Sequence, residues 1–191
     1  GKVAGQYVNA LVELAKAQLA AGNSAAAIDF LERARRFPDN LGEGKLAGAR
    51  ENQIDYYLGR ARAAGNQSEL AARHFQAATS GSAEPAAALY YNDQPPDLIL
   101  YQALAHRALG DLERCRSIAQ GLVDYGEAQR DTTVTIDYFA VSLPDFLVFD
   151  DDMQARHRRH CRYMMGLGYL GLEQPEQAAA CFDAVLADDP A

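Results

Sequence analysis

The sequence predicts an all-α fold, an α-α superhelix or solenoid in which about four helical hairpins stack in a row. Two observations carry this prediction. Alanine fills 36 of the 191 positions, and a high alanine content favours closely packed helices over sheets. A ladder of small and large residues at intervals of 12, 4 and 3 also recurs four times along the chain, as expected for a repeated helical unit.

The ladder is clearest near the C-terminal end, where Gly166 is followed by Ala178, Phe182 and Val185. The earlier copies are Ala15, Ala27, Leu31 and Ala34; Gly59, Ala71, Phe75 and Ala78; and Ala103, Cys115, Ala119 and Leu122. Small side chains at the first two positions let the helices of one hairpin approach closely, and the large residue one turn later fills the gap to the next hairpin. The third copy departs from this pattern, because Ala119 replaces the large residue.

Four units are expected near residues 7–41, 51–80, 97–126 and 154–190, with an insertion over 127–153, all within one domain over 1–191. The paired helices are predicted at 7–21 and 24–37, 51–64 and 68–79, 97–109 and 112–125, and 154–170 and 175–187. Turns at Gly22-Asn23, Gly65-Asn66, Gly110-Asp111 and Gly171 supply the positive φ that follows a helix. Ser24 and Ser68 are expected to cap the helices that follow, and Pro175 to lie in a first turn.

The segment from Gly166 to Pro190 resembles the tetratricopeptide repeat, with its small residues where two antiparallel helices approach and its proline after the second helix. The inserted segments 38–46, 90–97 and 136–152 resemble the C-terminal tetratricopeptide region of bacterial proteins that carry, further upstream, the domain of unknown function 5107. The resemblance implies a fragment of a longer protein, with a β-rich upstream part related to carbohydrate-active modules. It implies no catalytic residue on this chain.

Charge and composition exclude several classes of partner. The chain has 18 basic and 26 acidic side chains and a net charge of −8, whereas nucleic-acid binding needs a clustered positive surface. No apolar run approaches the ~20 residues that span a bilayer. Three cysteines without paired spacing suit a reducing compartment, so a cytoplasmic location is predicted.

A tetratricopeptide-like array lines a concave groove with the first helix of each unit. The expected groove residues are Asn9, Lys16, Gln53, Tyr56, Tyr57, Arg60, Asp97, Tyr101, His160 and Tyr163. Tyrosines offer rigid, amphipathic contact area that suits an extended peptide and also stacks on sugar rings. A clamp for a terminal carboxylate is not favoured, because only Asn9, Lys16 and Arg60 offer donors.

A second cluster of aromatic and acidic residues lies on the inserted segments and consists of Tyr90, Tyr91, Asp93, Asp145 and Phe146. Two interpretations stay open: these segments either fold back to fill the superhelix or form a docking surface. Asp145 and Asp150 invite comparison with a glycosidase pair. Capping of the helix that follows Asp152 explains the acidic run without catalysis.

Three other motifs receive structural interpretations. The segment Gly42–Lys45 lacks the spacing of a phosphate-binding loop and the Ser or Thr after its lysine, so it is interpreted as a turn. His157, His160 and Cys161 have helical spacing that suggests a metal site, but four nearby arginines and the lack of further ligands favour a packed Cys161 and solvated histidines. No metal or cofactor is predicted, and His106 and Cys115 are interpreted as core residues.

The sequence therefore predicts a noncatalytic interaction module of a larger bacterial protein. Its tyrosine-rich groove is expected to bind a peptide segment or the protein's own upstream domain. The alternative is an accessory domain of a carbohydrate-active enzyme, with the loop aromatics near a sugar site. A third interpretation is self-association through the exposed face of the last hairpin, which would form a homo-oligomer.

Overall fold

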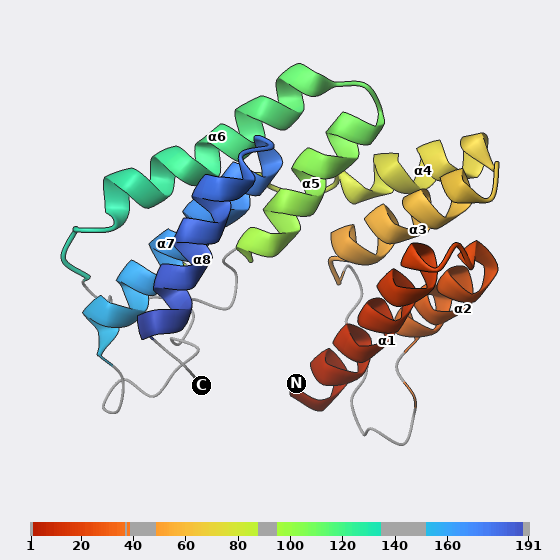
Figure 1. The fold of residues 1–191 in the computed structure, drawn as a ribbon, viewed down its shortest axis with the longest axis horizontal. Helices are drawn as coiled ribbons and strands as arrows, with labels where there is room; N and C mark the ends of the chain where they lie inside the picture. The colour runs from red at the N-terminus through yellow and green to blue at the C-terminus, as the bar shows by residue number, and fades with distance from the viewer. Residues whose placement is uncertain (1, 37, 39–48, 88–94, 135–151, 189–191) are drawn as a thin grey trace. The chain divides into compact units, whose positions relative to one another are not determined.

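A computed structural model describes residues 2–36, 38, 49–87, 95–134 and 152–188. In these residues the chain forms eight α-helices and no strand, which confirms the predicted all-α helical repeat fold. The helices are α1 (Lys2–Ala20), α2 (Ser24–Ala34), α3 (Asn52–Ala64), α4 (Ser68–Ala78), α5 (Pro96–Ala108), α6 (Leu112–Gln129), α7 (Met153–Gly171) and α8 (Pro175–Asp188) (Figure 1).

The chain divides into two compact units. The first comprises Gly1–Gly81 with Ala108–Gly110, and the second comprises Ser82–Arg107 with Asp111–Ala191. In the first unit α2 packs on α1 and α3, and α4 packs on α3. In the second unit α7 packs on α6 and α8, and a core cluster that includes Ile99, Cys115 and Met164 joins α5, α6 and α7. Each unit therefore contains two consecutive hairpins, and the single domain over 1–191 stays a prediction.

The second position of the ladder occupies the same place in every hairpin. Ala27, Ala71, Cys115 and Ala178 are each the fourth residue of the second helix of their hairpin. All four are buried, with exposures between 0% and 4%. The repeat predicted from residue spacing is thus a repeat in three dimensions.

The four hairpin turns also share one backbone conformation. Gly22, Asn66, Gly110 and Glu173 each lie five residues before the ladder position and have φ values of 79°, 58°, 87° and 61°. The next residue of each turn donates its N–H to the carbonyl five residues earlier, over 2.8–2.9 Å; these bonds join Asn23 to Gln18, Gln67 to Arg62, Asp111 to His106 and Gln174 to Tyr169. This is the Schellman motif, which satisfies the last carbonyls of a helix.

Three of the four predicted turns are confirmed, and the assignment of Gly171 is wrong. In the Gly65-Asn66 turn, Gly65 has φ −85° and Asn66 supplies the positive φ. Gly171 is the buried last residue of α7, and the positive φ falls on Glu173, two residues later. A Cβ on Gly171 would lie 2.7 Å from the Cβ of Ala119, so this glycine serves helix packing and not turn geometry.

The predicted helix starts are confirmed in part. Asn23 and Gln67 occupy the N-cap positions of α2 and α4 and make no side-chain cap bond, so the expected caps Ser24 and Ser68 are wrong. Asp152 caps α7 by accepting the Ala155 N–H at 3.0 Å, as the acidic run predicted, and Pro175 begins α8. The helix predicted to end at residue 125 continues to Gln129.

Glycines set the distance between the two helices of a hairpin. A Cβ on Gly59 would lie 2.5 Å from the ring of Phe75, and a Cβ on Gly166 would lie 2.5 Å from the ring of Phe182. These are the first and third positions of the ladder in the second and fourth hairpins. A real Cβ does not approach so closely, so the phenyl ring occupies the space that glycine leaves.

The same principle applies between the third and fourth hairpins, where α6 packs on α7. Because Ala119 is small, α7 approaches α6 until a Cβ on Gly168 would lie only 2.7 Å from the Ala119 carbonyl oxygen and from Cγ2 of Val123. On α6, Gly126 makes a matching approach to Met165. The departure of Ala119 from the ladder therefore reflects a closer helix contact than a large residue allows.

Gly168→Ala is expected to destabilise the protein by about 1–3 kcal/mol, because the new methyl group meets backbone that cannot rotate away. Gly121→Ala is the matched control on α6, since nothing lies within 4 Å of the position that its Cβ would occupy; it should stabilise by up to about 1 kcal/mol through helix propensity. Urea unfolding followed by circular dichroism measures both free energies. Equal effects of the two substitutions would contradict the packing role of Gly168.

Candidate functional site

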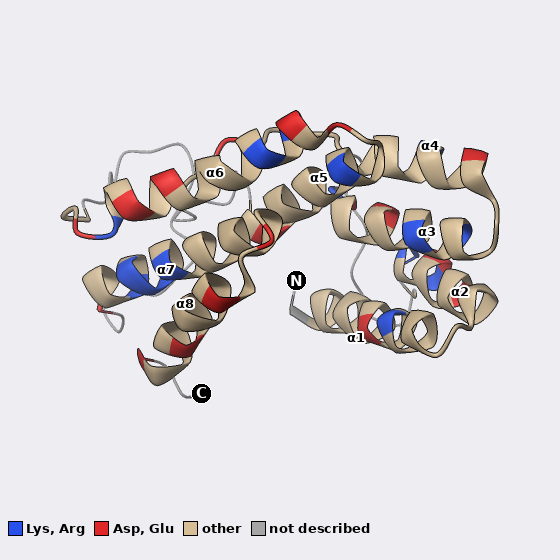
Figure 2. Cartoon of the chain, turned by 45° about the horizontal axis from the view of Figure 1, so that its top comes forward, with Lys and Arg blue, Asp and Glu red and all other residues tan. Residues whose placement is uncertain are grey.

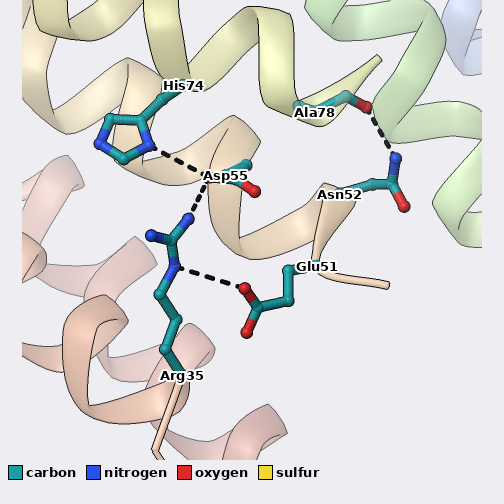
Figure 3. A network of polar contacts seen from close by, with 6 residues as sticks. All are labelled: Arg35, Glu51, Asn52, Asp55, His74 and Ala78. Carbon is teal, nitrogen blue, oxygen red and sulfur yellow. Dashed lines mark hydrogen bonds and ion pairs between the residues drawn. The ribbon is translucent and has the colours of Figure 1, made fainter. Parts of the chain in front are cut away.

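Buried polar contacts fix the orientation of α3, which carries four of the predicted groove residues. Asn52 is 2% exposed at the start of α3. Its Nδ2 donates to the carbonyl oxygen of Ala78 at 2.8 Å (Figure 3) and to that of Ser80, also at 2.8 Å. These carbonyls lie at the end of α4 and just beyond it. One side chain thus ties the start of one helix to the end of its partner, where unpaired carbonyls need donors.

A second contact joins three elements at Asp55, which is 8% exposed on α3. Its Oδ1 accepts from the guanidinium of Arg35, which follows α2, and lies 3.1 Å from Nδ1 of His74 on α4 (Figure 3). Arg35 Nε also lies 3.6 Å from Glu51 Oε2. Because a buried charge is costly without partners, this network holds α3 in one place relative to α2 and α4.

Three predicted groove residues meet on the α1–α3 surface of the first unit. Lys16 Nζ lies 5.9 Å from the centroid of the Tyr57 ring, and the Arg60 guanidinium lies 5.8 Å from it. Two cations therefore flank one aromatic ring, the geometry of a cation–π contact. Lys16 also pairs with Glu13 at 2.8 Å, and the hydrogen bond to Glu13 raises the Lys16 pKa above its usual value.

The other groove residues of this unit differ in their surroundings. Tyr57 is only 8% exposed. The surface at this point is therefore formed by Lys16 and Arg60, and the phenol ring of Tyr57 lies beneath them. The Tyr56 ring packs against Phe75 of α4 at a centroid distance of 6.0 Å, and Gln53 is half-buried. Asn9 is exposed on α1.

In the second unit, Asp97 lies in the first turn of α5 and Tyr163 lies on α7. Burial raises the pKa of both side chains, and the charge of Asp97 raises the pKa of Tyr163 further. The Tyr163 ring packs at 6.0 Å from Phe182 of α8 and against the core cluster of α5, α6 and α7. Tyr101 is half-buried one turn beyond Asp97, and Nε2 of His160 lies 2.9 Å from the Ala86 carbonyl oxygen.

The proposed loop surface of Tyr90, Tyr91, Asp93, Asp145 and Phe146 lies outside the described residues, as do Gly42–Lys45. The described surface is hollowed at the starts of α4 and α6, in shallow cavities lined by Asn66–Leu70 and by Asp111, Glu113, Arg114 and Ser117. Neither cavity includes a predicted groove residue.

The suggested metal site at His157, His160 and Cys161 does not form. The described residues hold no group of three His, Cys, Asp or Glu side chains that could bind a metal ion. His157 is 6% exposed, so its interpretation as a solvated histidine is wrong; its Nε2 lies 2.8 Å from the Gln129 carbonyl oxygen and 3.7 Å from Cys161 Sγ. Figure 2 shows positively charged residues along α7.

Cys161 and Cys115 are buried, which confirms their interpretation as packed residues. His106 is only half-buried and pairs with Asp111 at 3.3 Å, so it is satisfied but lies at the edge of the core. Another cross-hairpin contact was not predicted: Arg107 of α5 donates to the Gly171 carbonyl oxygen at 2.5 Å and pairs with Glu173 at 3.1 Å. The sequence signal for this contact was the position of Arg107, four residues after the ladder residue Ala103 on the same helix.

A family model described as tetratricopeptide repeat matches residues 9–40. This range covers most of α1 and all of α2. Together with the equivalent turns and ladder positions of all four hairpins, it identifies the fold as a tetratricopeptide-like helical repeat. Repeats of this class generally mediate contacts between proteins. No helix in the described residues is long and apolar enough to cross a membrane.

Asp55→Asn should lower the free energy of unfolding by about 2 kcal/mol, because Arg35 and His74 lose a buried carboxylate partner. Asp29→Asn is the control: its contact with Arg33 spans 3.7 Å between side chains that are 53% and 70% exposed, and its loss should cost less than about 0.5 kcal/mol. Urea denaturation measures both. A cost for Asp55→Asn no greater than that of the control would show that the network does not hold α3.

Cys161 should make stability depend on pH in the alkaline range. Desolvation raises the pKa of the buried thiol from 9.0 to about 11, so the folded chain keeps a proton that the unfolded chain releases. Unfolding is therefore favoured as pH rises from about 9 to 11, by at most about 3 kcal/mol. Thermal unfolding of wild type and Cys161→Ala across this range tests the effect, and parallel pH profiles would contradict it.

Proposed function

We propose that this chain is a noncatalytic protein-interaction module that binds an extended peptide segment, or a neighbouring domain of its own protein, through its first helices. The observation that carries the proposal is the meeting of Lys16, Tyr57 and Arg60 on the α1–α3 surface. These residues come from two hairpins and were predicted as groove residues from their repeat positions alone. Because the Tyr57 ring is buried, it holds Lys16 and Arg60 in place, and these two side chains present directed cationic groups to a ligand.

Preorganisation supports this function. The contacts of Asn52 with the end of α4 and of Asp55 with Arg35 and His74 hold α3 before any ligand arrives. A receptor surface that is already ordered loses little conformational entropy on binding, so more of the contact energy appears as affinity. The mechanism of the module is thus to present fixed side chains to a ligand that becomes ordered on them.

The resemblance to the C-terminal region of proteins with the domain of unknown function 5107 supports one particular occupant, a domain upstream in the same protein. A peptide from another protein is the second occupant. Both would meet the same first-helix residues. Copurification with the longer protein, with and without residues 1–191, distinguishes a lost external partner from a released upstream domain.

Reversing the charges of Lys16 and Arg60 together, by Lys16→Glu and Arg60→Glu, should weaken peptide binding by about tenfold or more. The probe is a set of fluorescent peptides selected on the wild-type chain from a random displayed library, with affinity measured by fluorescence anisotropy. The matched control reverses Arg36 and Arg73, which are exposed on and after the second helices of the same unit.

Three results of this experiment decide the proposal. Loss of affinity in the groove variant alone supports binding at the α1–α3 surface. Equal affinities in both variants would place binding elsewhere. Failure to select any peptide, with a correctly folded chain, would remove the peptide-binding function.

A further inference from the structure

Each unit contains one contact between consecutive hairpins, and both contacts use the same register. In the contact of α6 with α7, a Cβ on Gly168 would lie 2.7 Å from Cγ2 of Val123. In the contact of α2 with α3, Arg35 donates to Asp55 of α3. Val123 and Arg35 both lie eight residues after the second ladder position of their hairpins. This position of a second helix therefore faces the first helix of the next hairpin.

The last hairpin exposes an apolar side chain at the same position. Leu186 of α8 is 64% exposed, whereas Val123 at the equivalent position of α6 is 2% exposed. Phe182, one turn before Leu186, is half-buried, whereas its equivalents Leu31 and Ala119 on α2 and α6 are fully buried. The face of α8 that corresponds to the buried faces of α2 and α6 is thus apolar and open to solvent.

The first helix exposes the matching face. Leu14 of α1 is 47% exposed, whereas Leu58 and Met165 at the equivalent positions of α3 and α7 are 0% and 8% exposed. Ala10 and Ala17, one turn before and one turn after Leu14, are exposed as well. Their equivalents on α3 and α7 are buried and are Ile54, Ala61, Cys161 and Gly168. The face with which α3 and α7 receive the preceding hairpin is therefore open on α1.

The two open faces complement each other in shape and in charge. The α8 face carries large side chains, Phe182 and Leu186, and the α1 face carries small ones, Ala10 and Ala17, on either side of Leu14. α1 contains two lysines and one glutamate, whereas α8 contains three acidic residues and no basic one. Opposite charge favours the pairing of α8 with α1 over the pairing of α8 with a second α8. A second copy of this chain supplies both halves of the contact in the right register.

We propose that α8 of one copy packs on α1 of a second copy, in the register of the α2–α3 and α6–α7 contacts, so that the helical repeat continues from copy to copy. Leu186 of one copy then lies against Leu14 and Ala17 of the next, as Val123 lies against Gly168 within the chain. The contact joins two different surfaces, so each copy keeps one face free and the assembly is an open chain or a ring. The contact does not depend on the peptide-binding function, because its residues are not those of the α1–α3 surface.

Sedimentation velocity over a series of protein concentrations tests the contact. The wild-type chain should form species larger than a dimer as the concentration rises. Leu14→Glu and Leu186→Glu should each weaken this association by about tenfold or more, because either variant buries a charge in the contact. Leu112→Glu is the matched control, since Leu112 is 49% exposed at the start of α6 and lies outside both faces; it should associate like the wild type.

A mixture of the two face variants gives the decisive measurement. Leu14→Glu leaves the α8 face intact and Leu186→Glu leaves the α1 face intact, so the mixture should form a heterodimer and nothing larger. A mixture that stays monomeric while the wild type associates would overturn the inference. Loss of association in Leu186→Glu but not in Leu14→Glu would also overturn it, in favour of a two-fold contact between α8 helices. A wild-type chain that is monomeric at every concentration would overturn it as well. Circular dichroism confirms that each variant is folded.

Discussion

The distance between neighbouring helices is the constraint on which the other features of this chain depend. Glycine at positions 59 and 166 lets a phenyl ring pack directly on the backbone of the facing helix, and Gly168 brings α7 against the carbonyl of Ala119. Helices at this separation exclude water from the contact, so the few polar groups inside must find partners in the protein. The contacts of Asn52, Asp55 and Arg107 are examples, and each joins elements that the small residues have brought close.

Residue spacing was sufficient to predict the hairpins because each hairpin repeats the same buried contact and the same turn. The ladder positions are buried at the same place in four second helices, and each turn closes with the same Schellman bond. Spacing could not distinguish a glycine that adopts positive φ from one that makes room for a neighbour. Gly171 was therefore assigned to the turn, although Ala119 occupies the space beside it and Glu173 adopts the left-handed conformation.

The groove itself stays a prediction, but repeat positions placed its expected residues on first helices. Lys16, Tyr57 and Arg60 lie close together, because α1 and α3 are the first helices of consecutive hairpins and contact each other. The surroundings of each side chain were not predictable from one sequence. Tyr56 packs against Phe75, whereas the adjacent Tyr57 lies between two cations. The network around Asp55 was missed for a similar reason, since its three members come from segments whose approach follows only from the packed fold.

The two units present different electrostatic chemistry on equivalent helices. In the first, Lys16 and Arg60 flank the ring of Tyr57; in the second, the carboxylate of Asp97 lies in the first turn of α5, and the ring of Tyr163 packs against Phe182. A net charge of −8 attracts basic ligands over distances up to the Debye length of about 8 Å at physiological salt, and beyond it only weakly. Lys16 and Arg60 therefore act on a ligand mainly at contact range, because the net charge of the chain has the opposite sign to theirs.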